Sequence, residues 1–440
     1  MNAATTLERI AASHAGLAPG LTGGPAWAQR RQHALASLLG HGLPDRRDEN
    51  WKYLDHARVA EYLVDAGPRV AVSPEVLKPF ELPVAGARRL VLVDGRFDAR
   101  LSDADAGDGL QIDDLGALLS RDPAAALELL RAPGDDADDR YALLADAFAA
   151  DGVLIRVAPG AAPARPLYLT QVSTAATPGT HQARVVIDVG AGAKLVLIEH
   201  FIALGTAATL GNLAAELRVG ADAELTHVRL HQHGAAAAQV ETWVTRLAAG
   251  SRYDQHLLAL GGRLVRSNLR LTLEGRAAEC RLMGLFMADG DRQVDLYTQI
   301  THEGAATRTV QDFRGIASDR GRGAFNGRIV VQPTARGADA SQNSRNLLLT
   351  PLAEINSRPQ LEIHIDEVQC RHGATIGTLD PAQLFYLLSR GLDPDTARGL
   401  LTFAFCQDLI GRLPLPALRA TVEAMVAGTL PDRELIRGLI

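Results

Sequence analysis

Lysine is almost absent from this sequence of 440 residues, which contains only Lys52, Lys78 and Lys194. Arginine supplies nearly all of the positive charge. Lys and Arg together number 45 against 51 Asp and Glu, which gives a formal net charge of −6. A protein that binds nucleic acid by neutralising phosphates shows a basic excess or basic runs, and the sequence has neither. The composition therefore argues against a nucleic-acid partner.

Cysteine and long apolar runs are also scarce. The three cysteines, Cys280, Cys370 and Cys406, are too few and too scattered for a disulfide framework. Cys280 and Cys406 have no His or Cys at ligand spacing, and we interpret them as small buried hydrophobic residues. No apolar run approaches the ~18 residues of a membrane span, and the first residues lack the order of a signal peptide. We expect a soluble, cytoplasmic protein with no membrane partner.

The familiar motifs of catalytic and nucleotide sites are missing. The sequence has no G-x-x-x-x-G-K-[ST] loop for phosphate, no G-x-S-x-G elbow, no H-E-x-x-H pair and no C-x-x-C. His231 and His233 would share one face of a strand, a pattern more typical of a surface than of a metal site. We therefore expect no enzymatic activity and no tightly bound cofactor.

Glycine-containing turns recur through the middle of the chain. They place Gly190, Gly220, Gly250, Gly275 and Gly304 at steps of 25 to 30 residues, with short segments of alternating apolar residues between them. Such a period is typical of a β-solenoid, in which each coil buries its apolar edge by stacking on its neighbours. About 220 residues would give roughly eight coils and a rod of about 40 Å. An antiparallel sandwich is the alternative, although its turns are less regularly spaced.

Helical patterns lie on both sides of this region. We predict an N-terminal helical domain over residues 1–150, with a small hairpin whose turn is Asp94-Gly95. The predicted parallel β-solenoid covers residues 151–378, and a C-terminal helical domain covers residues 379–440. There, Asp380-Pro381 and Asp393-Pro394 each resemble an N-cap followed by proline at the first helical position. The predicted fold class is mostly β, with α-helical domains at both ends.

One segment, residues 361–372, is rich in side chains that bind metals. In a regular strand, Leu361, Ile363 and Ile365 would face the core. The other face would carry carboxylates, imidazoles and a thiol, the ligands of transition metals: Glu362, His364, Asp366, Cys370 and His372. Cys370 and His372 would project to the same side and form one edge of a metal site, because a complete site needs about four donors. An ordinary solvated face with an uninvolved cysteine remains the alternative.

The C-terminal helices have more apolar surface than one core contact requires. Residues 383–391 form a helix with an Arg390-Gly391 stop, and the next helix is apolar on most sides around residues 400–410. Burial within the tail and contact with a partner protein both remain open.

Four stretches together resemble the SufB/SufD family of iron–sulfur cluster assembly proteins: DENWKYLD at 48–55, DLYTQITHEGAATRTVQDFRGI at 295–316, GAFNGRIVVQPTARGADASQN at 323–343, and residues 341–392. Sequences of the SufB branch have a cysteine shortly after an Arg-Asn pair. In this chain, Arg345-Asn346 is followed by three leucines and a threonine instead. SufB-type sequences also have Glu where this chain has Gly373. Both departures indicate the SufD branch.

The resemblance implies a right-handed parallel β-helix between helical domains, in a scaffold subunit rather than an enzyme. It implies a SufB-like paralogue as partner, a SufC-like ATPase bound at the C-terminal helices, and a homodimer when the chain is alone. It also implies a transient iron ion or iron–sulfur cluster at the seam between the paralogues, with His372 as a ligand and Cys370 assisting. The residues expected to contact a partner are Leu384, Phe385, Tyr386, Leu388, Arg390, Gly391, Leu401 and Phe405.

A β-helix enzyme that cleaves polysaccharide is the alternative function. Such enzymes use clustered carboxylates along the groove of the rod, and aromatic side chains on which sugars stack. The low aromatic content, 5%, argues against it.

Overall fold

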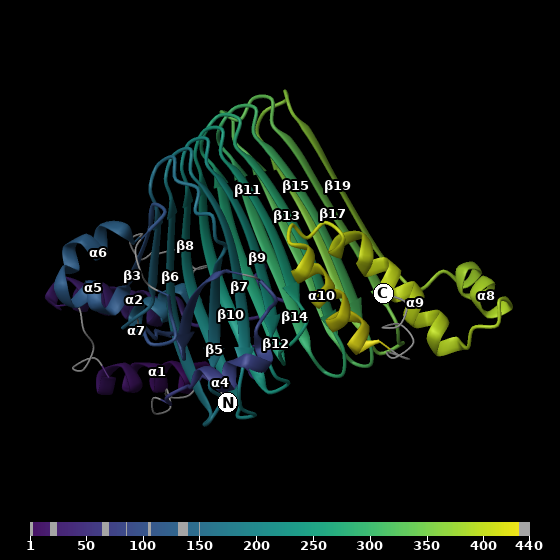
Figure 1. Cartoon of the computed structure of the whole chain (residues 1–440), viewed down its shortest axis with the longest axis horizontal. Coiled ribbons are helices and arrows are strands. Elements are labelled where there is room, and N and C mark those ends of the chain that lie inside the picture. Colours follow the sequence, from purple (N-terminus) through teal and green to yellow (C-terminus); the bar gives the residue numbers. More distant parts are fainter. Residues whose placement is uncertain are drawn as a thin grey trace.

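The computed structural model of the chain describes residues 3–17, 24–63, 70–84, 86–103, 107–130, 140–148 and 150–430. In this part of the chain, two long sheets run side by side along one axis, with helices at both ends (Figure 1). None of the described helices is long and apolar enough to span a membrane.

Successive strands alternate between the two sheets. Sheet A holds the odd-numbered strands of the solenoid: β5 (Leu167–Ser173), β7 (Lys194–Ala203), β9 (Glu224–Gln232), β11 (Arg252–Ala259), β13 (Glu279–Ala288), β15 (Arg308–Ala317), β17 (Asp339–Leu348) and β19 (Gln369–Gly377). Sheet B holds the even-numbered strands: β4 (Val153–Val157), β6 (Gly179–Val189), β8 (Thr209–Val219), β10 (Ala237–Leu247), β12 (Leu264–Leu273), β14 (Gln293–His302), β16 (Arg322–Val331) and β18 (Glu354–Ile363).

Each of these strands pairs in parallel with the strand one coil away, and the register carries no offset along the stack. Glu199 of β7, for example, lies opposite Arg229 of β9, and Arg322 of β16 lies opposite Glu354 of β18. Parallel strands need a crossover connection, and here the strand of the opposite sheet supplies it. The predicted parallel solenoid of about eight coils is therefore confirmed, and the sandwich alternative is wrong.

Close stacking of the turns explains the glycine repeat. A Cβ atom on Gly275 would lie 1.9 Å from the backbone nitrogen of Ala249, and one on Gly304 would lie 2.2 Å from the carbonyl oxygen of Gly275. A Cβ atom on Gly220 would lie 2.7 Å from the nitrogen of Ala191. These glycines stand where a turn rests directly on the backbone of the preceding coil, so a side chain has no room.

The interior between the sheets is mainly apolar. Alternate residues of each strand point inward, and large buried rings such as Trp243, Phe286 and Phe325 fill the space. Cys280 is 3% exposed in this core, and Cys406, which belongs to a C-terminal helix, is fully buried. The interpretation of both as buried hydrophobic residues is confirmed.

One charged group interrupts the apolar interior. Arg229, Glu199 and Glu241 have no exposed surface. The Arg229 Nε atom lies 3.3 Å from the Glu199 Oε2 atom, and the guanidinium also contacts the Glu241 carboxylate. The same guanidinium stacks on the ring of Trp243, 4.6 Å from its centroid. We refer to Glu199, Arg229 and Glu241 as the buried triad.

Two histidines expected at the surface lie in the interior instead. His231 is fully buried and its Nε2 atom is 3.4 Å from Glu241, while His233 is 7% exposed. Burial lowers the pKa of His233 to about 3, so this imidazole is neutral at pH 7. The surface prediction is wrong because polar residues also occupy inward positions next to the buried triad.

The N-terminal part combines helices with strands that join both sheets. The predicted hairpin is confirmed: β1 (Arg88–Val93) and β2 (Arg96–Phe97) are antiparallel, and both turn residues, Asp94 and Gly95, have positive φ. β1 also extends sheet A beside β5, and β3 (Leu110–Asp114) extends sheet B beside β4. The helical segments are α1 (Ala3–Leu17), α2 (Gly24–His41), α3 (His56–Tyr62), α4 (Pro74–Leu77), η2 (Lys78–Phe80), α5 (Leu115–Arg121), α6 (Pro123–Leu129) and α7 (Arg140–Phe148).

The segment around Trp51 attaches the N-terminal part to sheet B. Trp51 is fully buried, and the guanidinium of Arg266 on β12 lies 4.2 Å from its ring centroid. Arg266 donates to the carbonyl of Asn50 at 2.8 Å and pairs with Asp295 of β14 at 2.8 Å. A cation between an indole face and a buried carboxylate is held from both sides, so this segment is fixed on the sheet.

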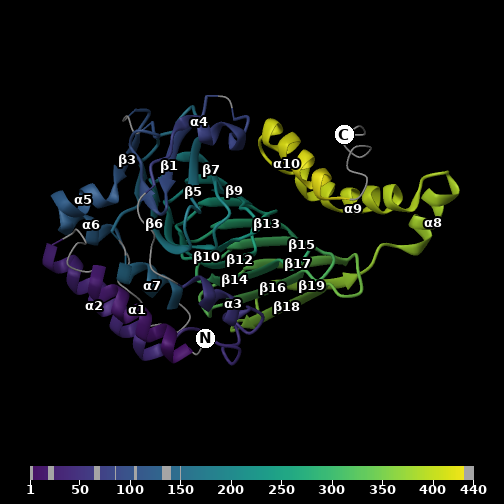
Figure 2. The same ribbon diagram turned by 90° about the horizontal axis from the view of Figure 1, so that it is seen from below.

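The C-terminal helices are α8 (Pro381–Ser389), α9 (Pro394–Ile410) and α10 (Pro416–Thr429), and residues 431–440 lie outside the described part. Asp380 and Asp393 cap α8 and α9 through their side chains, as predicted. α9 and α10 lie along the outer face of sheet A (Figure 2). Phe403, Cys406 and Leu409 pack there with strand residues such as Leu285. The solenoid itself therefore covers much of the apolar surface of α9.

We predict that Gly304→Ala destabilises the protein by about 1–3 kcal/mol, because the added methyl group overlaps the backbone of the preceding coil. The melting temperature by calorimetry measures the effect. Gly40→Ala is the matched control, since Gly40 lies in α2 with nothing within 4 Å of an added Cβ. It should leave stability unchanged or raise it slightly. Equal melting temperatures for Gly304→Ala and the wild type would contradict the stacking explanation.

Candidate functional site

The solenoid ends with two open strand edges. β18 pairs with β16 and β19 pairs with β17, and no strand of the described residues pairs with the other side of either. An edge strand presents unpaired N–H and C=O groups, to which another chain can add a strand. We call β18, β19 and the turn between them the open end.

The metal-binding pattern at residues 361–372 is divided between two strands. β18 ends at Ile363 and β19 begins at Gln369, with the corner of the coil between them. The prediction of one regular strand is therefore wrong, because a coil of this size must change direction here. The corner separates Glu362, His364 and Asp366 from the face that carries Cys370 and His372. The predicted core stripe is interrupted too, since Ile363 is 44% exposed.

Cys370 and His372 both belong to β19. They are two residues apart, so their side chains leave the strand on the same side, and they lie opposite Ala340 and Gln342 of β17. Cys370 is half-buried and packs against the apolar interior, whereas His372 is exposed. The structure therefore presents an accessible imidazole next to a partly covered thiol, on the last strand of the sheet.

The surroundings of Cys370 keep its thiol protonated. Partial burial raises its pKa, and the carboxylate of Asp339 on the neighbouring strand raises it further. The thiolate is the form that binds a metal, so a metal must displace the proton of this thiol.

No complete metal site is present in the described part of the chain, where no group of three or more His, Cys, Asp and Glu side chains is close enough to hold an ion. The nearest other imidazole in sequence, His364, pairs with Glu362 at 2.9 Å. Glu362 also contacts Arg328. Cys370 and His372 would thus supply two of the roughly four donors that a site requires.

Exposed apolar side chains lie around the same end of the solenoid. Leu352 in the turn before β18 is 68% exposed, and Ile376 of β19 is 45% exposed. The sequence does not single out these residues, because apolar residues recur along the whole solenoid. Only the structure shows that these side chains belong to the last coil, where no further coil covers them.

α8 is the second exposed apolar element. It has no buried residue, and Figure 1 shows it projecting away from the solenoid. Phe385 is 72% exposed, Tyr386 is 55% exposed, and Leu388 is at the surface as well. Arg390 stacks on the ring of Tyr386 at 5.1 Å. Leu384 is half-buried, and Gly391 ends the segment with a φ of 92°.

The two partner-binding residues predicted on α9 are less accessible. Leu401 and Phe405 are half-buried. The guanidinium of Arg314 on β15 lies 5.2 Å from the ring centroid of Phe405 and donates to the Phe405 carbonyl. Phe405 therefore already helps to hold α9 on sheet A, and α8 carries the larger free surface.

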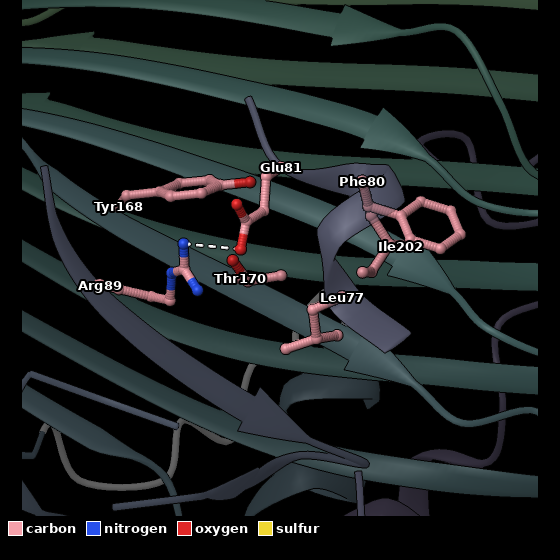
Figure 3. Close-up of a pocket in the computed structure, with 7 residues that line it drawn as sticks. All are labelled: Leu77, Phe80, Glu81, Arg89, Tyr168, Thr170 and Ile202. Carbon is pink, nitrogen blue, oxygen red and sulfur yellow. Dashed lines mark ion pairs between the residues drawn. The ribbon is translucent and has the colours of Figure 1, made fainter. Parts of the chain in front are cut away.

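A small cavity on the outer face of sheet A offers no ligand site. Leu77, Phe80 and Ile202 line one side of it, and Arg89 and Glu81 form an ion pair of 2.8 Å on the other (Figure 3). Its volume of about 10 Å³ holds a single water molecule at most.

We predict that alkylation of Cys370 by iodoacetamide is slow at neutral pH and still accelerates at pH 9.0, the ordinary pKa of a thiol. Asp339→Asn should shift this rate profile to lower pH, because it removes a negative charge that opposes the thiolate. Mass spectrometry of the modified peptides measures the rates. Cys280 and Cys406 are buried internal controls that should stay unmodified in the folded protein. A rate for Cys370 that levels off below pH 9.0 would contradict this assignment.

Comparisons with known proteins agree with this architecture. A family model described as "SUF system FeS cluster assembly, SufBD core domain" matches residues 171–405. The iron–sulfur cluster assembly protein SufD of Escherichia coli K12 is 32% identical over 408 residues, which cover 92% of this chain and 93% of that protein. A SufBD family protein of Synechocystis is 28% identical over 90% of each chain. The chloroplastic protein ABCI7 of Arabidopsis thaliana is 26% identical over 91% of this chain and 85% of that protein. The chain belongs to the SufB/SufD family of iron–sulfur cluster assembly proteins.

Proposed function

We propose that this chain is a non-enzymatic, SufD-like scaffold subunit that works in the cytoplasm within a SufBCD-type complex. In this proposal it contributes to iron acquisition and to formation of the nascent cluster at a seam with a SufB-like paralogue. The observation that supports it best is the position of Cys370 and His372 on β19, an edge strand at the open end.

The open end suits a partner with the same fold. A paralogous solenoid can continue both sheets by adding its own strands to β18 and β19, and this pairing satisfies the free backbone groups. Contact would also cover Leu352 and Ile376, whose exposure is costly in water. A second copy of this chain can use the same surface when the paralogue is absent, which gives the proposed homodimer.

Iron or the growing cluster is cargo in this proposal. The His372 imidazole binds iron through a neutral ring nitrogen, and Cys370 binds as thiolate after losing its proton. The paralogue and an external sulfur donor supply the remaining ligands. The partial burial of Cys370 indicates the assisting role, because the exposed His372 meets an incoming ion first.

ATP hydrolysis belongs to a separate subunit, since the sequence contains no phosphate-binding loop. We propose that a SufC-like ATPase binds α8 through Phe385, Tyr386 and Leu388, with Leu384, Arg390 and Gly391 shaping the helix and its end. Large exposed aromatic side chains next to an arginine are the composition typical of interface hot spots.

We predict that His372→Ala lowers the iron–sulfur cluster content of the assembled complex by about tenfold, the order expected when a metal site loses a key group. The complex is purified without oxygen, and its iron and acid-labile sulfide are measured. His364→Ala is the matched control: it is also an exposed imidazole at the open end, but it pairs with Glu362. Cluster content that stays normal in His372→Ala, with the complex intact, would refute the proposed ligand.

We predict that Phe385→Asp weakens capture of the ATPase subunit by about 2 kcal/mol, or roughly thirtyfold, because it places a charge in an apolar contact. Titration calorimetry with the purified ATPase measures the affinity. Val76→Asp, at an apolar position of α4 that is 48% exposed, should leave the affinity unchanged. Unchanged affinity in Phe385→Asp would show that the ATPase binds elsewhere.

A further inference from the structure

A polar cavity lies between the segment around Trp51 and the outer face of sheet B. Its volume is about 280 Å³, close to the lower limit of roughly 300 Å³ for small-molecule sites. Arg46, Lys52 and Tyr53 line it from the N-terminal segment. Arg322 of β16 and Glu354 of β18 line it from the sheet. We call it the basic cavity.

The three cations of the basic cavity have no acidic partner. Among the described residues, none forms an ion pair with Arg46, Lys52 or Arg322. The Lys52 ammonium lies 4.8 Å from the ring centroid of Tyr53. Lys52 is also one of only three lysines in the sequence.

Arg322 differs in this respect from an arginine on the same strand. Arg328 pairs with Glu362 across β16 and β18. Glu362 lies two positions beyond Gln360, the direct partner of Arg328 in the ladder. Arg322 lies directly opposite Glu354, and among the described residues the two form no ion pair. The Glu354 carboxylate instead accepts a hydrogen bond from Asn356 at 2.7 Å. In the part of the chain that the structure describes, the Arg322 side chain has no ion-pair partner beside the cavity.

The second carboxylate of the cavity is also engaged. Asp55 caps α3 by accepting from the backbone N–H of Arg58, and its other oxygen lies 3.9 Å from the Arg58 side chain. The Asn356 amide is neutral and leaves the charge of Glu354 in place, whereas Asp55 has a cationic partner in Arg58. Three basic groups therefore face one uncompensated carboxylate. The free charge of the cavity is positive.

One wall of the cavity is ordered, although the side chains of Arg46, Lys52 and Arg322 are exposed. The buried Gln293 side chain donates to the carbonyl of Tyr53 and accepts from the N–H of Asp55 at 3.0 Å. These two bonds fix the N-terminal segment over β14, next to the anchor formed by Trp51 and Arg266. A site whose wall is already ordered loses little entropy when it binds.

We propose that the basic cavity binds a small organic phosphate, with Arg322, Arg46 and Lys52 around the phosphate group. Guanidinium groups match phosphate oxygens in a fork geometry, and an ammonium adds a compact charge. The volume accommodates a small molecule and excludes a folded partner. This site is distinct from Cys370 and His372, and its existence does not depend on the function proposed above.

Titration calorimetry of the full chain with inorganic pyrophosphate, at low ionic strength, tests the proposal. We expect saturable binding of one pyrophosphate per chain. Arg322→Gln and Lys52→Gln should each weaken it by about tenfold, equivalent to ~1.4 kcal/mol. Arg276→Gln is the matched control, because Arg276 is an exposed arginine on a turn away from the cavity. It should bind pyrophosphate as the wild type does.

Three results would overturn the proposal. They are no binding of millimolar pyrophosphate, equal affinity in the wild type and both cavity variants, and an affinity for citrate equal to that for pyrophosphate. The last would show a general anion site without preference for phosphate. Circular dichroism confirms that each variant is folded, and Lys52→Gln keeps the test valid if Arg322→Gln unfolds, since Lys52 is exposed.

Discussion

Main-chain hydrogen bonding between successive coils is the interaction on which the rest of the structure depends. Every strand inside the stack is satisfied by a strand on each side, in unbroken parallel register. The stack must therefore end somewhere with unsatisfied strands. At its start, β1 with its hairpin partner β2, and the antiparallel β3, complete the two sheets. At the other end β18 and β19 remain open, and the proposed cluster ligands lie there.

The helical parts complement this arrangement. α9 and α10 cover the outer face of sheet A, and the Trp51 segment is fixed on sheet B through Arg266. Both attachments leave the last strands uncovered at their free edges, and α8 extends beyond the solenoid. The protein therefore has a rigid body with two separate exposed surfaces. This division is consistent with the scaffold function proposed above, in which the chain holds two partners.

Much of the fold follows from local sequence patterns, and the failures have physical causes. Gly220, Gly275 and Gly304 recur because backbones touch once per coil, so their spacing revealed the solenoid. Asp94-Gly95 revealed a hairpin, since few residue pairs adopt its turn. The prediction of alternating strand faces failed at residues 364–368, because the chain turns a corner there and no glycine marks it. The prediction failed again at His231, because alternation along a strand does not show which of its two faces points into the solenoid when both carry polar residues. The position of Cys370 and His372 on one side of a strand is a local property that the sequence predicts, but the exposure of each side chain depends on which coil is last.

The buried triad has a consequence for how the chain selects its alignment while folding. If β9 slipped by two residues against β7, apolar side chains would still face inward, and the hydrophobic contribution would change little. Arg229 would then lose its place opposite Glu199, and the Glu199 carboxylate would remain in a dry interior without its cation. A misaligned strand is thus destabilised electrostatically at this coil. Apolar contacts alone would not distinguish the correct alignment from one shifted by two residues.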